Sequence, residues 1–195
     1  MLKSEERASR TKESLLDALV ELAEGTSINR ITVTQLSRKA NINRITFYRH
    51  FDGMSDFLNR LIDEVIESLQ IPPTSEVFRS RQGAITYYTL FFDSVKRHDS
   101  FFVMMLGNNG LPDFRTRFLS TRRRWHESVV MMNRNEFNPI INNKLLAVTF
   151  VANLLSLIEY WLTEDRERNS GYMAEQLIAL TYDRVLVNYG KSRKI

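Results

Sequence analysis

Cysteine is absent from the 195 residues, and glycine and proline are scarce, with 7 and 4 residues. The absence of cysteine excludes a disulfide scaffold, a thiolate nucleophile, a cysteine-bound zinc and an iron–sulfur site. So few turn-forming residues argue against a β-sandwich, a barrel or a glycine-rich nucleotide fold. Hydrophobic residues make up 43% of the chain, which is typical of a globular protein. The composition therefore favours an all-α fold with long helices.

Neither a secretory signal nor a membrane span is expected from the sequence. Its first residues, Met1 to Ala23, are charged from the third position and contain neither an apolar core nor a small-residue cleavage site. The most apolar later stretch, Leu145 to Leu162, includes Asn153, Ser156 and Glu159, which are costly in hydrocarbon. We interpret this stretch as a buried helix and expect a cytoplasmic protein of one or two compact units.

Capping signals predict two short helices joined by a tight turn. After a first helix from Glu13 to Ala23, Thr32 and Gln35 form a capping box at the start of a helix from Val33 to Ala40. Asn41 can close that helix in the left-handed conformation, and Asn43 is the N-cap of the next. This spacing is typical of a helix-turn-helix.

Further helices follow. An apolar stripe from Phe57 to Leu69 predicts one more helix, which ends at Pro72 and Pro73, the best candidate for a boundary. Beyond it, helical segments are expected at 77–97, 101–106, 114–132, 143–164 and 172–189, about nine helices in all. The expected breaks are 99–100, 107–112, 135–142 and 169–171.

The helix-turn-helix segment is strongly basic. Between Gly25 and Asp52 there is no Asp or Glu, whereas the whole chain carries only +4. The basic residues in this segment are Arg30, Arg38, Lys39, Arg44 and Arg49. A solvated helix face normally mixes charges of both signs, so this local excess indicates a surface that contacts phosphates.

Residues 32–51 read TVTQLSRKANINRITFYRHF, which resembles the DNA-binding signature of the TetR/AcrR family of bacterial transcriptional regulators. The Thr-Phe-Tyr-x-His-Phe core is specific, and the resemblance extends over about residues 10–66. It implies a helix-turn-helix DNA-binding domain at 1–53, a connecting helix at 54–72 and a C-terminal effector-binding and dimerisation domain at 73–195. The region after Pro73 is similar to the family in layout and length.

Several residues are expected to contact DNA. Arg44, near the start of the second helix of the motif, is the first candidate for a bidentate contact to guanine, and Ile45 can pack on a thymine methyl. The resemblance implies phosphate contacts from Thr32, Thr46 and others in the segment. The full set is Thr32, Thr34, Asn43, Arg44, Ile45, Thr46, Tyr48, Arg49 and His50.

Other residues in this segment serve the core or depart from the family pattern. Phe47 and Phe51 share one face of the helix and are expected to be buried. Met54 stands where the family usually has a lysine that contacts a phosphate. Ile45 replaces a small residue or proline, which favours an individual operator sequence.

Aromatic residues and methionines in the second half are candidates for a ligand pocket, because they suit an apolar lining. The same residues at helical spacing also build an ordinary core, and Glu159 could instead lie in a subunit interface or at the surface. The candidates are Tyr88, Phe91, Phe92, Phe102, Met105, Phe118, Trp125, Met132 and Glu159.

A second charge cluster comprises Arg115, Arg117 and Arg122 to Arg124. We interpret it as a solvated helix face. The alternative is a site for an anionic effector or a phosphate-bearing partner, which the spacing does not by itself support. The three histidines, at 50, 98 and 126, have no spacing typical of a metal site, so no metal and no cofactor are expected.

The segments 143–164 and 172–189 are too apolar to be covered within one chain of this size. Two of each would form a four-helix bundle, as the resemblance implies, so we expect a homodimer that binds a near-palindromic DNA operator and responds to a small organic effector. Alternatives are an activator or a regulator controlled by a protein partner, and a purely structural dimer. An enzyme is not expected, because no phosphate loop, nucleophile elbow or histidine cluster is present.

Overall fold

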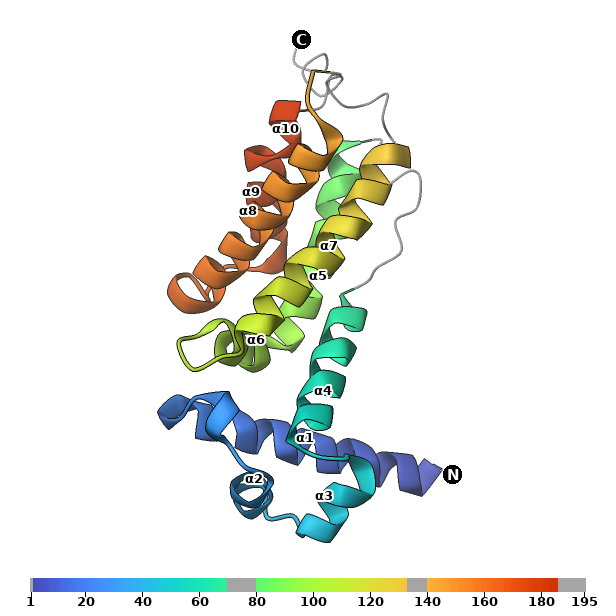
Figure 1. Cartoon of the computed structure of the whole chain (residues 1–195). Coiled ribbons are helices and arrows are strands. Elements are labelled where there is room, and N and C mark those ends of the chain that lie inside the picture. Colours follow the sequence, from blue (N-terminus) through green and yellow to red (C-terminus); the bar gives the residue numbers. More distant parts are fainter. Residues whose placement is uncertain (1, 70–79, 133–139, 186–195) are drawn as a thin grey trace. The chain divides into compact units, whose positions relative to one another are not determined.

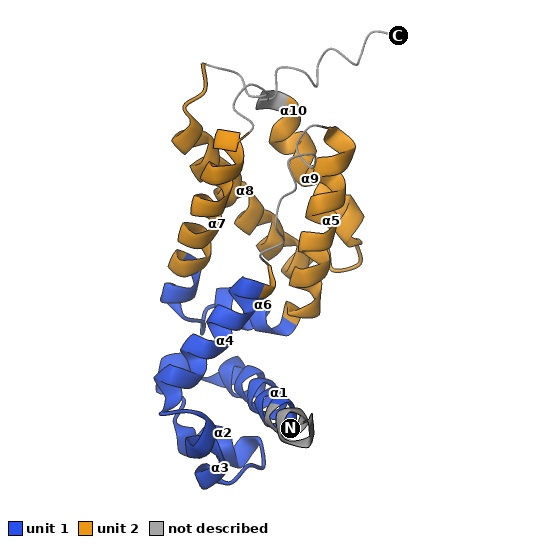
Figure 2. Ribbon diagram, turned by 90° about the vertical axis from the view of Figure 1, so that its right-hand side faces the viewer, with its two compact units in different colours: residues 1–67, 100–115 blue, residues 68–99, 116–195 orange. Residues whose placement is uncertain are grey.

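A computed structural model describes residues 2–69, 80–132 and 140–185. In this part of the chain, all regular structure is helical, with ten α-helices and one 3₁₀ helix (Figure 1). The expectation of an all-α fold is confirmed. The chain divides into two compact units: unit 1 contains residues 1–67 and 100–115, and unit 2 contains residues 68–99 and 116–195 (Figure 2).

Unit 1 contains the helix-turn-helix and a long supporting helix. Its elements are α1 (Leu2–Gly25), η1 (Ile28–Arg30), α2 (Val33–Lys39), α3 (Arg44–His50), nearly all of α4 (Met54–Ser68), and α6 (Asp99–Leu106) except its first residue. Three phenylalanine rings pack together in its core. The ring centroid of Phe51 lies 5.3 Å from that of Phe47 and 5.0 Å from that of Phe57. Phe47 and Phe51 are buried, as predicted.

The turn between α2 and α3 forms as the local sequence predicts. The Thr32 hydroxyl accepts from the Gln35 N–H at 3.2 Å, and the Gln35 side chain accepts in return from the Thr32 N–H at 2.9 Å. Asn41 adopts a φ of 53°, the left-handed conformation that ends a helix. The Asn43 side chain accepts from the Ile45 N–H at 2.8 Å and caps α3. These bonds fix the angle at which α3 leaves the turn.

The loop between α6 and α7 is held against α1 within unit 1. The Asn109 side chain donates to the Ala23 carbonyl at 2.8 Å, and the Asn109 carbonyl accepts from the Ile28 N–H at 3.0 Å. Gly110 is required beside it, because a Cβ there would lie 2.1 Å from the Met105 carbonyl oxygen. Asn109 therefore satisfies carbonyl groups that the end of α1 leaves without intrahelical partners.

Unit 2 is a helical bundle. It contains α5 (Arg81–Arg97), most of α7 (Pro112–Met132), α8 (Asn143–Glu164), α9 (Ser170–Leu180) and α10 (Tyr182–Val185). Ser80, Asn142 and Asn169 cap α5, α8 and α9 through their side-chain oxygens. Helix α9 packs against α5, α8 and α10. The resulting core is lined by side chains from all of these helices.

By length and composition, α8 is apolar enough to cross a membrane. Half of its most apolar window is buried inside the structure, however, and the core helix of a soluble protein passes the same test. Leu154, Ile158 and Trp161 of this helix are fully or almost fully buried. These positions agree with the interpretation of this segment as a core helix.

Several expected boundaries need correction. One helix was expected from Tyr172 to Tyr189, but the structure has two, because Thr181 separates α9 from α10. Residues beyond 185 lie outside the described part. The expected break at 99–100 is wrong, because Asp99 begins α6. The expected break at 169–171 extends too far, because Gly171 lies inside α9. The segment 77–97 is helical from Arg81, and Pro72 and Pro73 lie outside the described residues, as do 133–139.

The three-part division expected from the sequence, at 1–53, 54–72 and 73–195, stays a prediction about function. The compact units follow packing and not chain order, because residues 100–115 pack with unit 1 although they follow the expected boundary. Helix α7 consequently has its first residues, up to Arg115, in unit 1 and the remainder in unit 2.

Candidate functional site

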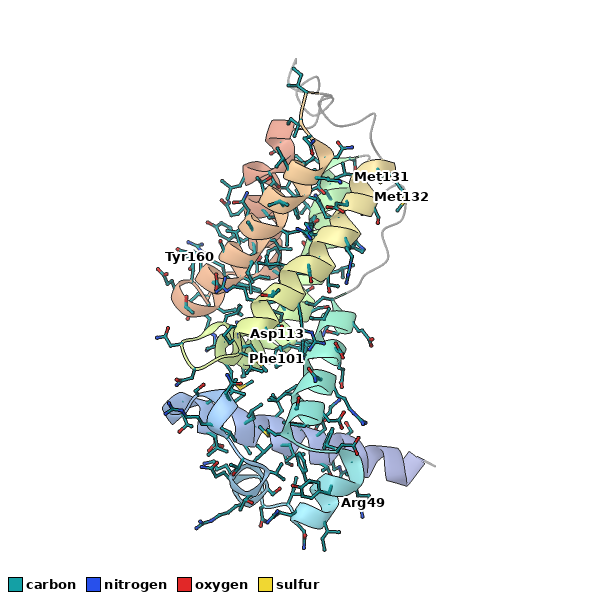
Figure 3. All side chains as sticks on the ribbon, in the orientation of Figure 1. Arg49, Phe101, Asp113, Met131, Met132 and Tyr160 are labelled. Atoms are coloured by element: carbon teal, nitrogen blue, oxygen red, sulfur yellow. The ribbon has the colours of Figure 1, made fainter. Side chains whose placement is uncertain are left out.

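The predicted DNA contacts, which we call the reading surface, lie on α2, on α3 and at the N-caps of these two helices, and most of them are exposed. Ile45 is 77% exposed and Tyr48 is 50% exposed, although both are large apolar or aromatic residues. Arg49 projects from α3 (Figure 3). The other exposed members are Thr32, Thr34, Asn43 and Arg44, and the half-buried members are Thr46 and His50.

Most of the positive charge around this surface is not neutralised. Lys39 forms an ion pair with Glu21 of α1. Within the described part of the chain, no acidic side chain bonds to Arg30, Arg38, Arg44 or Arg49, all of which are exposed. A surface of exposed arginines without acidic neighbours attracts phosphates.

Two of the predicted contacts already have a structural task. The Thr32 hydroxyl and the Asn43 side-chain oxygen are used as N-caps of α2 and α3. The Asn43 amide nitrogen is not part of this cap and can donate to an external acceptor. Arg44, directly after the cap, is the first residue of α3, where its long side chain can extend from the helix end.

The first turn of α4 lacks the cation that the family pattern places there. Met54 is half-buried, and the nearby Asp56 carboxylate accepts from the Asp52 N–H at 3.0 Å and from the Arg60 side chain at 2.9 Å. The bond from Arg60 is the main cause that lowers the pKa of Asp56. This end of α4 is consequently held by its own side chains.

Unit 2 contains a buried arginine that sequence reasoning placed on the surface. Arg122 is only 2% exposed, whereas its neighbours Arg123 and Arg124 are exposed. Its guanidinium donates to the Leu69 carbonyl at 3.2 Å and lies 4.6 Å from the ring centres of both Phe91 and Trp125. The interpretation of residues 122–124 as a uniformly solvated face is therefore wrong for Arg122.

His126, one helical turn after Arg122, is also buried. Its ring stacks on Phe150 of α8, with 4.1 Å between ring centroids. Within 2–69, 80–132 and 140–185, neither ring nitrogen has a hydrogen-bond partner. Burial, with a smaller contribution from the charge of Arg122, lowers the pKa of His126 to about 3, so the imidazole is neutral at physiological pH.

Three tyrosines complete this group. Tyr87 and Tyr88 of α5 have ring centroids 5.0 Å apart, and Tyr182 of α10 lies 6.4 Å from Tyr88 and 6.0 Å from His126. Burial is the main cause that raises the pKa of both Tyr87 and Tyr88. We call the set of Tyr87, Tyr88, Arg122, His126 and Tyr182 the interior polar cluster.

The predicted pocket residues are distributed unevenly. Phe102 and Met105 are buried in unit 1, whereas Tyr88, Phe91 and Trp125 gather around Arg122 in unit 2. Phe92 and Phe118 are buried in unit 2, and Glu159 of α8 is half-buried. Whether these residues contact a ligand stays a prediction.

Met132 is a correction, because it is 69% exposed at the end of α7 and does not belong to the buried interior of the described residues (Figure 3). Sequence reasoning also missed the burial of Arg122 and His126. Their spacing carried a signal, since Phe118, Arg122, His126 and Val129 follow one another at intervals of four, four and three residues and form one buried stripe.

Comparison with known proteins identifies the family. Residues 84–183, about half of the chain, match the TetR family model described as a transcriptional regulator C-terminal region. The chain belongs to the TetR family of transcriptional regulators. It is therefore a regulator and not an enzyme, as the sequence predicts.

Individual relatives agree with this assignment. The chain is 33% identical over 82 residues to YxbF of Bacillus subtilis (strain 168), an HTH-type transcriptional regulator, and the match covers 40% of this chain and 22% of YxbF. NalD of Pseudomonas aeruginosa, the secondary repressor of the MexAB-OprM multidrug efflux pump, has a TM-score of 0.68 at 15% identity, over 92% of this chain and 98% of NalD. SmeT, repressor of the Stenotrophomonas maltophilia pump SmeDEF, has a TM-score of 0.63 at 14% identity, over 91% of each chain.

Proposed function

We propose that this TetR-family protein is a cytoplasmic repressor that binds a near-palindromic DNA operator as a homodimer and is released by a small organic effector. The observation that carries the proposal is the reading surface, where exposed arginines without acidic partners surround a capped recognition helix. Since no acid neutralises them, these cations remain for phosphates and base edges.

Helix α3 is the proposed recognition helix. Its N-terminal residues Arg44 and Ile45 would read bases in the major groove, while Thr46, Tyr48, Arg49 and His50 would hold the flanking phosphates. Thr34, on α2, is exposed and is proposed as a further base contact. In this proposal the start of α3 recognises the base sequence, and most of the other residues of the reading surface position the protein on the DNA backbone.

The dimer is proposed to form through α8 and α9. Both helices bury one side in unit 2 and still expose large apolar or aromatic residues, which are Leu145, Val148, Tyr160, Tyr172 and Leu180. Figure 3 shows Tyr160 on the outer side of α8. A four-helix bundle of two copies would cover these side chains. A two-fold dimer would then present two recognition helices to half-sites spaced by one turn of DNA, ~34 Å, or a multiple.

Control by an effector is supported by the interior of unit 2 and by a structural neighbour. A few polar groups within an aromatic core are typical of a small-molecule site. SmeT has been solved as a complex with triclosan, and the chain resembles that structure with a TM-score of 0.67 at 14% identity. An effector that prefers the conformation with low operator affinity would release the DNA.

The proposal is tested by fluorescence anisotropy on DNA taken from around the protein's own gene, titrated with salt. We compare the wild type, an Arg44→Ala/Tyr48→Ala double variant, and an Arg123→Ala/Arg124→Ala control with exposed arginines of unit 2 replaced. The wild type and the control are expected to bind one site tightly with a steep salt dependence, and the double variant is expected to lose at least tenfold in affinity.

Equal and weak binding of all three proteins to any DNA would contradict the proposal and favour control by a protein partner. A normal circular dichroism spectrum of the double variant establishes that its loss of binding is not a loss of fold. Both replaced side chains are exposed, so their removal leaves the core intact.

A further inference from the structure

We infer that the interior polar cluster binds an organic monoanion, a carboxylate on an aromatic or apolar body, with Arg122 as its charge partner. The inference rests on the proposed effector control and names the chemical class of the effector. It is carried by a buried cation and a buried neutral imidazole on one face of α7, surrounded by aromatic rings.

Arg122 is a buried charge whose partners within the described residues include no carboxylate. Its guanidinium donates to the Leu69 carbonyl and lies against the rings of Phe91 and Trp125. Its Nε has no acceptor among the residues that the structure describes. Ring faces and one carbonyl offset only part of the cost of burying a cation, so an anion would gain strongly at this point.

His126 supplies a second polar anchor on the same face of α7. It follows Arg122 by four residues, one helical turn, and both of its ring nitrogens are buried and lack partners in the described part of the chain. The neutral imidazole has one N–H that can donate to a carboxylate oxygen. The apolar ring of Phe150 and the hydroxyl-bearing ring of Tyr182 face it from other helices, and the ring of Tyr88 packs against both of these rings.

The charges at the cluster favour a monoanion. Arg122 contributes one positive charge, and Tyr87, Tyr88 and His126 are neutral at physiological pH. A doubly charged phosphate would therefore leave one negative charge buried and unbalanced, and an amine would meet the guanidinium with like charge. A carboxylate matches both the single charge and the planar, two-pronged geometry of the guanidinium.

The surroundings favour an aromatic or apolar body on this anion. Trp125 stacks on Tyr87 with 5.2 Å between ring centroids, and Phe91 and Phe150 line the same interior. Rings of this kind bind a flat apolar body by stacking, while the few polar groups fix its orientation. The site thus combines an apolar wall with one point of charge recognition.

The test uses isothermal titration calorimetry on the full chain with matched probes. The probes are benzoate and 4-tert-butylbenzoate, their neutral amides, and benzylammonium. We expect a carboxylate to bind saturably and its matched amide to bind at least tenfold more weakly. Equal binding of the amide or the amine, or no binding by either carboxylate, would overturn the inference. This comparison needs no variant and cannot be lost to misfolding.

Variants then locate the site. Arg122→Met is expected to weaken carboxylate binding at least tenfold, while Arg123→Met, at the exposed neighbouring position, leaves it unchanged. Trp125 and Trp161 are the two tryptophans, so a Trp161→Phe background makes emission report on Trp125 beside Arg122. The assignment of the site to Arg122 would be overturned if carboxylate binding left this emission unchanged, or if Arg122→Met bound the carboxylate as tightly as the wild type does.

Failure of this inference and failure of the proposed function give different results. If the wild type binds its operator and a neutral compound releases it while carboxylates do not, the repressor stands and the anion site is wrong. If no DNA is bound specifically, the regulator proposal fails whatever the carboxylates do in calorimetry.

Discussion

The two units differ in the solvent exposure of the arginines at their candidate sites. Unit 1 exposes Arg30, Arg38, Arg44 and Arg49, and none of its described ionisable side chains is buried. Unit 2 buries Arg122 and His126 among aromatic rings. Exposed cations bind a polyanion at the surface at small cost to folding, whereas a buried cation lowers stability until an anion of matching shape arrives. This contrast supports the proposals that unit 1 binds DNA at its surface and that unit 2 holds a small ligand in its interior.

The largest effect expected from this difference is a loss of stability of unit 2 in acid. His126 has a pKa of about 3 in the fold and near 6.5 when unfolded. Below pH 6.5 the unfolded chain therefore binds a proton that the folded chain does not, and stability falls with falling pH by about 1.4 kcal/mol per pH unit, down to about pH 3. Urea unfolding followed by tryptophan emission measures this, because both tryptophans lie in unit 2.

The control is His126→Phe, which keeps a ring to stack on Phe150 and has no group to protonate. Carboxylates that titrate in the same range act equally in both proteins, so the difference between the two slopes isolates His126. Identical slopes for wild type and variant would show that His126 is not buried as the structure has it.

A smaller effect is expected from the cap of α2. Thr32→Ala removes the hydroxyl of the capping box and is expected to cost about 1 kcal/mol, which is about a fivefold rise in the hydrogen-exchange rate of α2 amides. Thr34→Ala is the matched control, since Thr34 is exposed and is not the N-cap. Mass spectrometry of peptides from α2 measures the rate, and an equal effect of the two variants would contradict the role of the cap.

The smallest effect concerns the salt dependence of DNA binding. Arg49→Gln is expected to lower the slope of log affinity against log salt by about 0.9, the value for one phosphate contact. Lys39→Gln is expected to lower it less, because Lys39 is already paired with Glu21. Anisotropy titrations at several salt concentrations compare the two variants. A larger change for Lys39 would show that its ion pair opens on DNA.

Local features were predictable from the sequence, and features set by packing between helices were not. The capping box of Thr32 and Gln35 and the left-handed Asn41 depend on neighbours within a few residues, so the sequence specifies them directly. Thr181, which interrupts the helix expected at 172–189, carries no comparable break signal. A residue of ordinary helix propensity ends a helix only in a particular tertiary context.

The two sites differ in the same way. The candidate DNA contacts could be predicted because they lie in one continuous segment that is rich in basic residues and in helix caps. The interior polar cluster instead draws residues from α5, α7 and α10, and its key member belongs to a run of three arginines that looks uniform in sequence. Helical periodicity places Arg122 on a different face of α7 from Arg123 and Arg124. Which of these faces is buried depends on how α5 and α8 pack against α7.

Helix α7 sets a limit on how this protein can diverge. Its first residues belong to unit 1, and Arg122 and His126 lie further along in unit 2. Each residue of an α-helix turns the chain by about 100°. One residue inserted or deleted between Arg117 and Arg122 would swing both side chains out of the aromatic interior. Relatives can therefore acquire new ligands by exchanging side chains along α7, but only while the length of this segment is conserved.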